Sequence, residues 1–250
     1  MKKILFPKSK KPFLKEIFSP ADYVNKVAAG LKLPKRAIIC PIAWLTKQVL
    51  SHAKYKKYNC VADIYVLEGK ELCYVSITGY GAPGFAMALE SLIALGVKEI
   101  IFIGLAGSLQ EEVQPGDIVL CDEALCNDGT SPCYTDKETA SANKTMLTKL
   151  ARTLKKNNIN FHTGRNWSTD AIFRETKEEV KHYQKHNVLT VEMETAALYT
   201  ICQKRKVRAV AAYSISDCLY NYKWEPHLRE KAIWKAMEVL YENALAMLRA

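Results

Sequence analysis

The stretch VEMETAAL at residues 191–198 brings two carboxylates to the point where an apolar run, Val188–Val191, gives way to small residues typical of a helix. A second run of β-branched and aromatic residues, 207–215, leads to Asp217. Ligands of open α/β sheets lie at the carboxyl ends of the strands. We therefore expect Glu194 and Asp217 to be neighbours at one ligand site. The alternative is that Glu194 stabilises a helix N-terminus and that Asp217 begins a turn.

Strand-like and helix-like segments alternate along the chain after a basic lead, residues 1–34. The apolar patterns predict strands at 36–40, 62–66, 72–78, 99–104, 117–124, 160–167, 188–191 and 207–215, with helices at 44–54, 84–95, 143–156, 177–186 and 227–250. Alternation of this kind, with one hairpin, favours the α/β class. We expect a single domain over 35–250, built as a mixed β-sheet flanked by helices.

The chain has 250 residues, of which 49% are hydrophobic, and a formal charge of +10. Six lysines of this excess lie within the first fifteen residues. The sequence contains neither a recognisable nucleic-acid motif nor a basic stripe interleaved with aromatic residues. The charge therefore indicates a general attraction for anions, including phosphorylated metabolites, and we expect no nucleic-acid partner.

Eight cysteines form no C-x-x-C pair, and several lie inside apolar segments, as Cys40, Cys73 and Cys202 do. This usage is typical of core residues in a reducing compartment and of a chain without a metal site. No apolar run reaches membrane-spanning length, and lysine and proline interrupt the first fourteen residues too often for a signal peptide. We expect a cytoplasmic protein with no membrane partner.

Residues 79–84 read GYGAPG and match the G-x-G-x-x-G pattern of dinucleotide-binding domains. The following strand, 99–104, carries no acid at its end, where such a domain places the residue that binds the ribose. The context thus disfavours a dehydrogenase. What remains is a glycine-rich turn whose backbone, around Gly81, can approach a ligand closely.

Six short motifs follow one another in a fixed order: GYGAP at 79–83, GLAGSLQ at 104–110, PGD at 115–117, TDAIFRET at 169–176, VEME at 191–194 and SD at 216–217. In this order they resemble the nucleoside phosphorylase family, which includes trimeric and hexameric purine nucleoside phosphorylases, uridine phosphorylases and related nucleosidases. The resemblance runs from about Ala37 to the C-terminus.

The resemblance implies roles for the two acidic segments. Glu194 would accept hydrogen bonds from the ribose hydroxyls, with Met193 packed against the sugar and Glu192 lining the same pocket. Asp217 would hydrogen-bond or protonate a purine ring nitrogen as the catalytic acid. An enzyme that breaks a ribosyl C–N bond must grip the sugar and stabilise the departing base, so these residue types suit the chemistry.

The base would lie against the segment at 173–175. By resemblance Phe173 stacks on the base, while Arg174 and Glu175 read its polar edges. The alternatives are that Phe173 is a core residue and that Arg174 and Glu175 form a surface ion pair.

The chain departs from the family at the phosphate site. Family phosphorylases hold phosphate with an arginine and a hydroxyl residue around the G-x-x-G turn, and these positions are Phe102 and Leu105 here. Thr46 stands where a second arginine is usual. Apolar side chains cannot bind a dianion. We therefore expect a weak anion site at most, formed by Gly81, Ser108 and Thr46.

Three functions remain open at this stage. The first is cleavage of a nucleoside, purine preferred and uridine possible through Arg174, with phosphate as the acceptor and no other cofactor. The second is hydrolysis, although residues 44–48 lack the glutamate with which hydrolytic relatives activate water. The third is nucleoside or base binding without turnover. Family sites usually borrow residues from a neighbouring subunit, so we expect a homo-oligomer, a dimer or a trimer of dimers, with the basic loop 52–59 at the interface.

Overall fold

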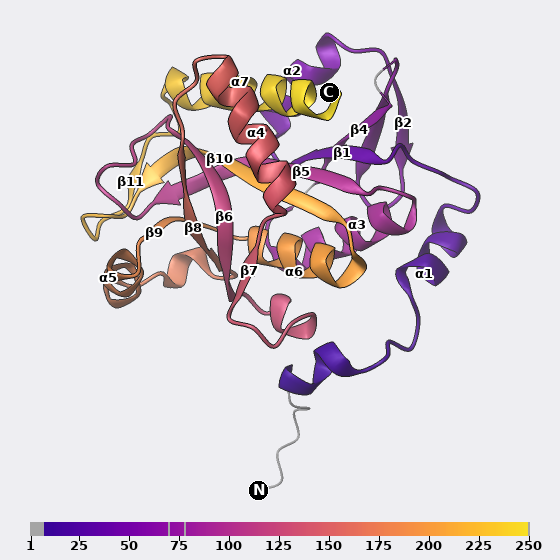
Figure 1. Ribbon diagram of the computed structural model, residues 1–250, viewed down its shortest axis with the longest axis horizontal. Coiled ribbons are helices and arrows are strands. Elements are labelled where there is room, and N and C mark those ends of the chain that lie inside the picture. The colour runs from indigo at the N-terminus through magenta and orange to yellow at the C-terminus, as the bar shows by residue number, and fades with distance from the viewer. Residues whose placement is uncertain (1–7, 70, 78, 250) are drawn as a thin grey trace, which may run out of the picture.

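The computed structural model describes residues 8–69, 71–77 and 79–249, and its central feature is one mixed sheet with helices on both sides (Figure 1). The strands are β1 (Arg36–Cys40), β2 (Tyr55–Asn59), β3 (Asp63–Leu67), β4 (Leu72–Ser76), β5 (Glu99–Ser108), β6 (Ile118–Asn127), β7 (Thr139–Ser141), β8 (His162–Thr169), β9 (Val188–Glu192), β10 (Arg208–Cys218) and β11 (Glu225–Pro226). The helices are α1 (Pro20–Val27), α2 (Ala43–Ser51), α3 (Ala82–Ala94), α4 (Lys144–Lys156), α5 (Lys177–Lys185), α6 (Thr195–Arg205) and α7 (Lys231–Arg249), with short 3-10 turns η1 (Lys8–Phe13), η2 (Ser131–Cys133) and η3 (Ile172–Arg174).

The sheet combines parallel and antiparallel pairs. Its strand order is β11-β10-β6-β8-β9-β5-β1-β4-β3-β2, with β7 beside β6. The long strand β5 also pairs with β10, so β5, β9, β8, β6 and β10 close into a ring. The ring brings the carboxyl ends of β5, β9 and β10 together, because Gly107 of β5 is the register partner of both Val191 and Asp217.

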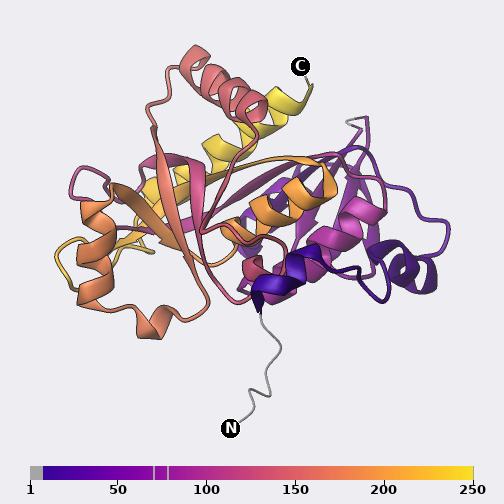
Figure 2. The same cartoon turned by 60° about the horizontal axis from the view of Figure 1, so that its bottom comes forward.

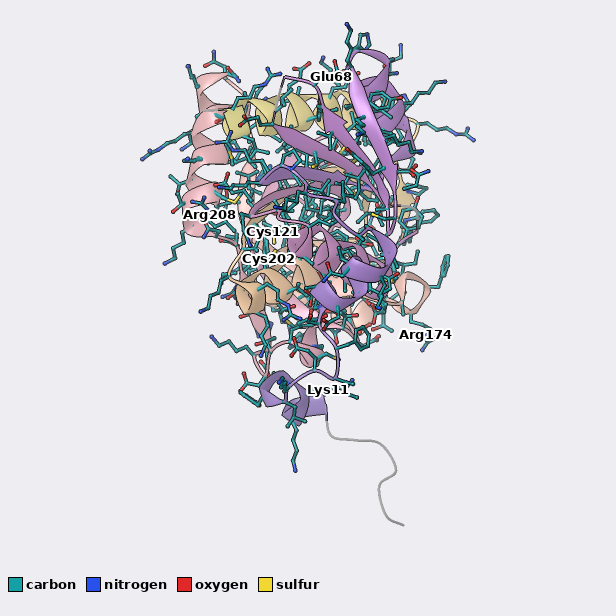
Figure 3. The ribbon with its side chains drawn as sticks, turned by 90° about the vertical axis from the view of Figure 1, so that its right-hand side faces the viewer. Lys11, Glu68, Cys121, Arg174, Cys202 and Arg208 are labelled. Atoms are coloured by element: carbon teal, nitrogen blue, oxygen red, sulfur yellow. The ribbon has the colours of Figure 1, made fainter. Side chains whose placement is uncertain are left out.

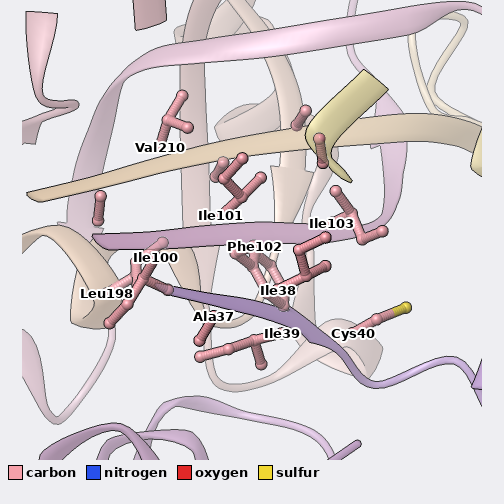
Figure 4. Packing of buried hydrophobic residues seen from close by; sticks show 14 of the residues in the cluster. Ala37, Ile38, Ile39, Cys40, Ile100, Ile101, Phe102, Ile103, Leu198 and Val210 are labelled. Atoms are coloured by element: carbon pink, nitrogen blue, oxygen red, sulfur yellow. The ribbon is translucent and has the colours of Figure 1, made fainter. Parts of the chain in front are cut away.

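Two helical layers cover the sheet. Helices α2, α4 and α7 lie on one side, and α3 and α6 pack against each other on the other side (Figures 1 and 2). The core is built from β-branched and aliphatic side chains of the central strands, packed against these helices (Figure 4). The continuous apolar runs of β1 and β5 reflect burial on both faces of the sheet.

The predicted α/β class, with a mixed sheet flanked by helices, is confirmed. One expectation is wrong: the segment 52–59 is not a loop throughout, because Tyr55–Asn59 forms the edge strand β2, paired antiparallel with β3. All five residues of β2 are polar or tyrosine and four are exposed, so the segment lacks the alternating burial that marks a strand in sequence. The cross-strand contact of Tyr55 with Tyr65, at a centroid distance of 5.2 Å, supports it.

Within the described residues, no helix is long and apolar enough to cross a membrane. The same residues contain no cluster of three His, Cys, Asp or Glu side chains that could hold a metal ion. All eight cysteines are free thiols.

Candidate active site

A cavity of about 680 Å³ opens where β5, β9 and β10 end. Its walls come from the β1–α2 junction, the G-x-x-G segment of β5, the η3–α5 segment, the β9–α6 junction, and the end of β10 with the residues that follow it, together with Tyr80. The site predicted at the carboxyl ends of the strands is therefore hollow. Of the residues predicted for it, the cavity is lined by Phe173, Glu175, Glu192, Met193, Glu194 and Asp217.

Glu194 is the acid most available to a ligand at the β9–α6 junction. One of its oxygens, Oε1, accepts a hydrogen bond of 2.5 Å from the backbone N–H of Gly81. Gly81 has a φ of +97°, a conformation that glycine adopts without strain. Burial and then the neighbouring Glu192 carboxylate raise the pKa of Glu194 to about 8. Its second oxygen, Oε2, accepts no hydrogen bond from the described residues, which leaves acceptor capacity for a sugar hydroxyl.

Glu192 differs from Glu194 because protein groups saturate its carboxylate. Oε1 accepts hydrogen bonds from Asn166 Nδ2 (2.6 Å) and Ser168 Oγ (2.5 Å). Oε2 accepts from the backbone N–H groups of Glu194 and Thr195 and from Thr195 Oγ1, each at 2.9 Å. Burial raises the pKa of Glu192, and these donors oppose the rise. Glu192 therefore lines the cavity, but both of its oxygens accept hydrogen bonds from protein groups, and these hydrogen bonds stabilise the β9–α6 junction.

A β-bulge aims Asp217 at the cavity. The register of β10 on β5 shifts between Ile215 and Asp217, and such a shift re-aims the side chain that follows it. Space for the carboxylate comes from Gly107, where a Cβ would lie 3.0 Å from Asp217 Oδ2 and 2.7 Å from Leu219. Asp217 accepts hydrogen bonds from Ser216 Oγ (2.6 Å) and from the indole N–H of Trp224 (3.1 Å).

Glu175 adds a fourth acid to the cavity, beside Glu192, Glu194 and Asp217. Burial, then Asp217 and then Glu179 raise the pKa of Glu175 to about 7. The influence of Asp217 on this pKa shows that the two carboxyls are close enough to interact. Two carboxyls that share one proton offer a donor and an acceptor together, which suits the polar edge of a heterocyclic base.

The other two predicted base contacts lie at the rim or outside. Phe173 borders the cavity but is 94% exposed, so it is not a core residue. Arg174 is exposed, does not line the cavity, and lies at the outer edge of the molecule (Figure 3). It forms no ion pair with Glu175 among the described residues.

The wall expected to hold phosphate is apolar. Phe102 is 2% exposed and lies among the aliphatic side chains of the core (Figure 4). It packs edge-on against Phe85, at a centroid distance of 5.2 Å. Leu105 lines the cavity beside it. Among the described residues at the cavity wall, the basic side chains are Lys177 and Lys223, both exposed at the rim.

The three residues expected to form a weak anion site are not among the residues that line the cavity. Ser108 is fully buried and its hydroxyl bonds to the backbone of Gln110. The hydroxyl of Thr46 lies within 3.2 Å of the Ile42 carbonyl and the Ser76 hydroxyl. Gly81 directs its N–H to Glu194. The structure does not bring these groups together into one site.

Trp224 is the contact that the sequence reasoning missed. It is 65% exposed, yet its indole N–H reaches Asp217. Residues 220–224 read YNYKW, an unusual concentration of aromatic residues shortly after the acid. That concentration is the feature from which an aromatic wall could have been predicted.

A family model described as "Phosphorylase superfamily" matches residues 35–247, and the chain belongs to this family. The chain is 32% identical over 168 residues to a guanosine phosphorylase from Halorubrum lacusprofundi, covering 67% of this chain and 68% of that one. It is 30% identical over 195 residues to a DeoD-type purine nucleoside phosphorylase from Clostridium novyi, covering 75% and 83%. The resemblance inferred from the ordered motifs is thereby confirmed.

Solved structures share the fold. A purine nucleoside phosphorylase from Toxoplasma gondii superposes with a TM-score of 0.77 at 19% identity, covering 87% of this chain and 91% of that one. A uridine phosphorylase from Vibrio fischeri gives 0.76 at 22% identity, covering 87% and 94%. The shared architecture extends over most of each chain.

Proposed function

We propose that the protein is a pentosyltransferase that cleaves the N-glycosidic bond of a purine nucleoside, with phosphate as the acceptor. The observation that carries the proposal is the pairing of Glu194 and Asp217 across one cavity at the strand ends. Glu194 retains free acceptor capacity for the ribose hydroxyls, and Met193 lies beside it at the cavity wall. Relatives named guanosine and purine nucleoside phosphorylases support the same activity.

The role of each residue in the cleavage follows from the charges that develop on the sugar and on the base during the reaction. As the C–N bond lengthens, positive charge grows on the sugar and negative charge on the base. Glu194 orients the sugar by accepting hydrogen bonds from its hydroxyl groups. Asp217 donates a proton or hydrogen bond to the purine ring nitrogen, and Glu175 contacts the base edge. Phe173 and Trp224 supply aromatic walls near the base.

Hydrolysis is the second candidate, because one observation favours it. The inner wall carries Phe102 and Leu105 in place of charged or hydroxyl donors, and the described cations that line the cavity lie at its rim. A phosphate dianion gains little from such a wall. A neutral water molecule, in contrast, can be bound without positively charged side chains.

One experiment separates the outcomes. The protein is incubated with inosine, guanosine, adenosine and uridine, each with and without phosphate or arsenate, and the sugar product is identified. Ribose 1-phosphate formed only with phosphate supports phosphorolysis. Free ribose independent of phosphate supports hydrolysis, and binding without cleavage leaves a nucleoside-binding protein. Uridine cleaved faster than the purine nucleosides would overturn the purine preference.

We further propose a homo-oligomer that works in the cytoplasm, in purine nucleoside metabolism, with no cofactor beyond phosphate. Support for the oligomer comes from large apolar side chains that stay exposed around the cavity mouth: Tyr80, Ile172, Phe173, Tyr222, Trp224 and Leu228. Support for the compartment comes from the eight free thiols. The basic lead, 1–34, is proposed as a segment outside the catalytic domain, 35–250.

A further inference from the structure

A second cavity, of about 310 Å³, lies at the opposite ends of the central strands from the candidate active site. Strands β1, β5 and β10 are parallel neighbours and begin at Arg36, Glu99 and Arg208. These three residues are register partners, so their side chains project on the same face of the sheet. The cavity sits over this row.

The residues that line the cavity are strongly basic. Five lysine and arginine side chains face one acid, Glu99: Lys35, Arg36, Lys98, Lys149 and Arg208. The Glu99 carboxylate contacts Arg36 Nε at 3.5 Å and an Arg208 guanidinium nitrogen at 2.5 Å. It lies between the two guanidinium groups and neutralises only part of their charge. The three lysines have no ion-pair partner in the part of the chain that the structure describes.

Helices α4 and α7 complete the cavity. Thr145, Met146 and Lys149 reach it from the first turns of α4, which carries no acidic residue in its first turn. An uncompensated helix N-terminus carries partial positive charge and adds to the field. Met247 and Leu248 of α7 supply apolar contact. Figure 3 shows Arg208 on the side of the molecule where α4 runs.

We propose that this basic cavity binds a small phosphate-bearing anion, of the size of a diphosphate or a sugar phosphate. Two guanidinium groups gathered beside one carboxylate present several N–H donors within reach of one ligand, which suits phosphate oxygens. The volume lies at the lower end of ligand pockets and fits a small anion. The site is independent of the proposed function, because it uses none of the residues of the active-site cavity.

The two cavities differ in charge. The active-site cavity is lined by Glu175, Glu192, Glu194 and Asp217, with basic side chains confined to its rim. The basic cavity therefore attracts anions more strongly than the acidic one. This predicts that anion affinity and nucleoside cleavage can be altered separately.

The test is isothermal titration of the full chain with inorganic pyrophosphate, at low and at physiological salt. The informative variants are Lys149→Glu and the double variant Lys98→Glu with Lys149→Glu. Lys156→Glu is the matched control, because it makes the same charge change on the same exposed helix outside the cavity. We expect saturable one-to-one binding that weakens at least about tenfold in Lys149→Glu and further in the double variant. The control should stay within about twofold of the parent chain.

Three results would overturn the proposal. One is the absence of saturable pyrophosphate binding by the parent chain. Another is equal weakening in Lys149→Glu and Lys156→Glu, which would mean a response to overall charge. The third is much tighter binding of a single-stranded oligonucleotide that displaces pyrophosphate, which would mean a nucleic-acid surface. Thermal unfolding of each variant checks that a lost affinity does not reflect a lost fold.

Discussion

Glu192 and Glu194 are the same residue type, but the number of hydrogen-bond donors around each carboxylate gives them different roles. Both Glu192 and Glu194 are buried at the β9–α6 junction. The oxygens of Glu192 accept five hydrogen bonds from protein groups, whereas Glu194 accepts one, from Gly81. A buried carboxyl with unused acceptors is costly unless a ligand supplies the donors. Glu194 is therefore the ribose-binding candidate, and Glu192 supports it.

Glu194→Gln should be more stable than the parent chain at alkaline pH. The folded state raises the pKa of Glu194 from 4.5 to about 8, so the stability present below the unfolded pKa is lost as the pH rises through about 8. The amide of the variant is neutral throughout, and its oxygen can still accept from Gly81 N–H. We expect the free energy of unfolding to rise by about 1–3 kcal/mol at about pH 9, with little difference near pH 4.5.

Urea unfolding at both pH values measures this difference. Equal stability of Glu194→Gln and the parent chain at alkaline pH would contradict the raised pKa. Nucleoside cleavage should fall in the same variant above about pH 8, where the parent carboxyl is ionised, because a neutral amide accepts sugar hydroxyls more weakly than a carboxylate.

Asp217→Asn should lower purine nucleoside turnover by roughly 10²- to 10⁴-fold, the usual contribution of a general acid. The amide keeps one of the two oxygens, which accept separately from Ser216 Oγ and from the Trp224 indole, but it cannot deliver the proton. Steady-state kinetics with inosine or guanosine measures kcat. Asp136→Asn, an exposed change outside the cavity, is the control and should leave kcat unaltered. Full turnover in Asp217→Asn would remove this residue from the chemistry.

Phosphate affinity should be weak. Phe102 and Leu105 occupy the wall where the resemblance implies an arginine and a hydroxyl, and Thr46 is bonded to Ile42 and Ser76 instead of facing the cavity. Each lost charge-assisted hydrogen bond costs roughly 1.5–3 kcal/mol, so two should lower affinity by about three orders of magnitude.

Competition by phosphate against nucleoside turnover gives the affinity at the active site, separate from anion binding elsewhere on the molecule. We expect half-saturation in the millimolar range. A low-micromolar value would mean that rim lysines such as Lys177 or Lys223 close over the cavity, and would contradict the prediction.

At the scale of elements, the β9–α6 junction depends on Glu192. Its Oε2 is the shared acceptor of Glu194 N–H, Thr195 N–H and Thr195 Oγ1. Glu192→Gln replaces one oxygen with an amide donor and leaves buried donors without partners. We expect a loss of about 2–4 kcal/mol in the free energy of unfolding, since each orphaned buried group costs roughly 1–3 kcal/mol. Denaturant unfolding near neutral pH should thus rank Glu192→Gln below the parent chain, and a neutral effect would contradict the network.

The elements that the sequence predicted well are those buried by the core. Strands β1 and β9 and helix α4 begin or end within one residue of the predicted bounds, because unbroken apolar runs and the amphipathic pattern of α4 mark them. The exposed pieces escaped prediction. Edge strand β2 has no apolar face, and α1 is a single short helix whose start is fixed by a local capping box at Ser19 and Asp22.

In the candidate site, too, the residues at the ends of buried strands were predicted and the residues in exposed loops were not. Glu194 and Asp217 were predictable as neighbours because they lie at the carboxyl ends of β9 and β10, which meet at one edge of the sheet. The indole of Trp224 on Asp217 and the outlying position of Arg174 depend on loop conformations between strands, for which the sequence has no periodic pattern. Ser108 and Thr46 were expected to face a ligand, but their hydroxyl groups donate hydrogen bonds to Gln110 and Ser76 inside the protein. The partner of a hydroxyl group depends on the local geometry, which the sequence pattern does not contain.

At the scale of the whole molecule, burial of apolar surface is incomplete. Phe173, Trp224 and Leu228 remain exposed at the cavity mouth, with exposed fractions of 94%, 65% and 45%. Clustered exposed apolar side chains around a site are typical of a surface that another protein covers. The edge strand β2 presents Tyr55 and Tyr58, a residue type enriched in interfaces, beside lysines, a type depleted there.

We therefore expect a homo-oligomer, built from dimers, at micromolar concentration. Multi-angle light scattering should give a mass of at least twice the 28.2 kDa of one chain. Phe173→Glu places a charge among the exposed apolar side chains and should shift the mass towards the monomer, because an unpaired charge is costly in an interface core. Lys156→Glu on α4 is the control and should keep the parent mass. A parent chain that remains at 28.2 kDa across the concentration range would contradict the prediction, and the exposed apolar side chains would then serve the ligand alone.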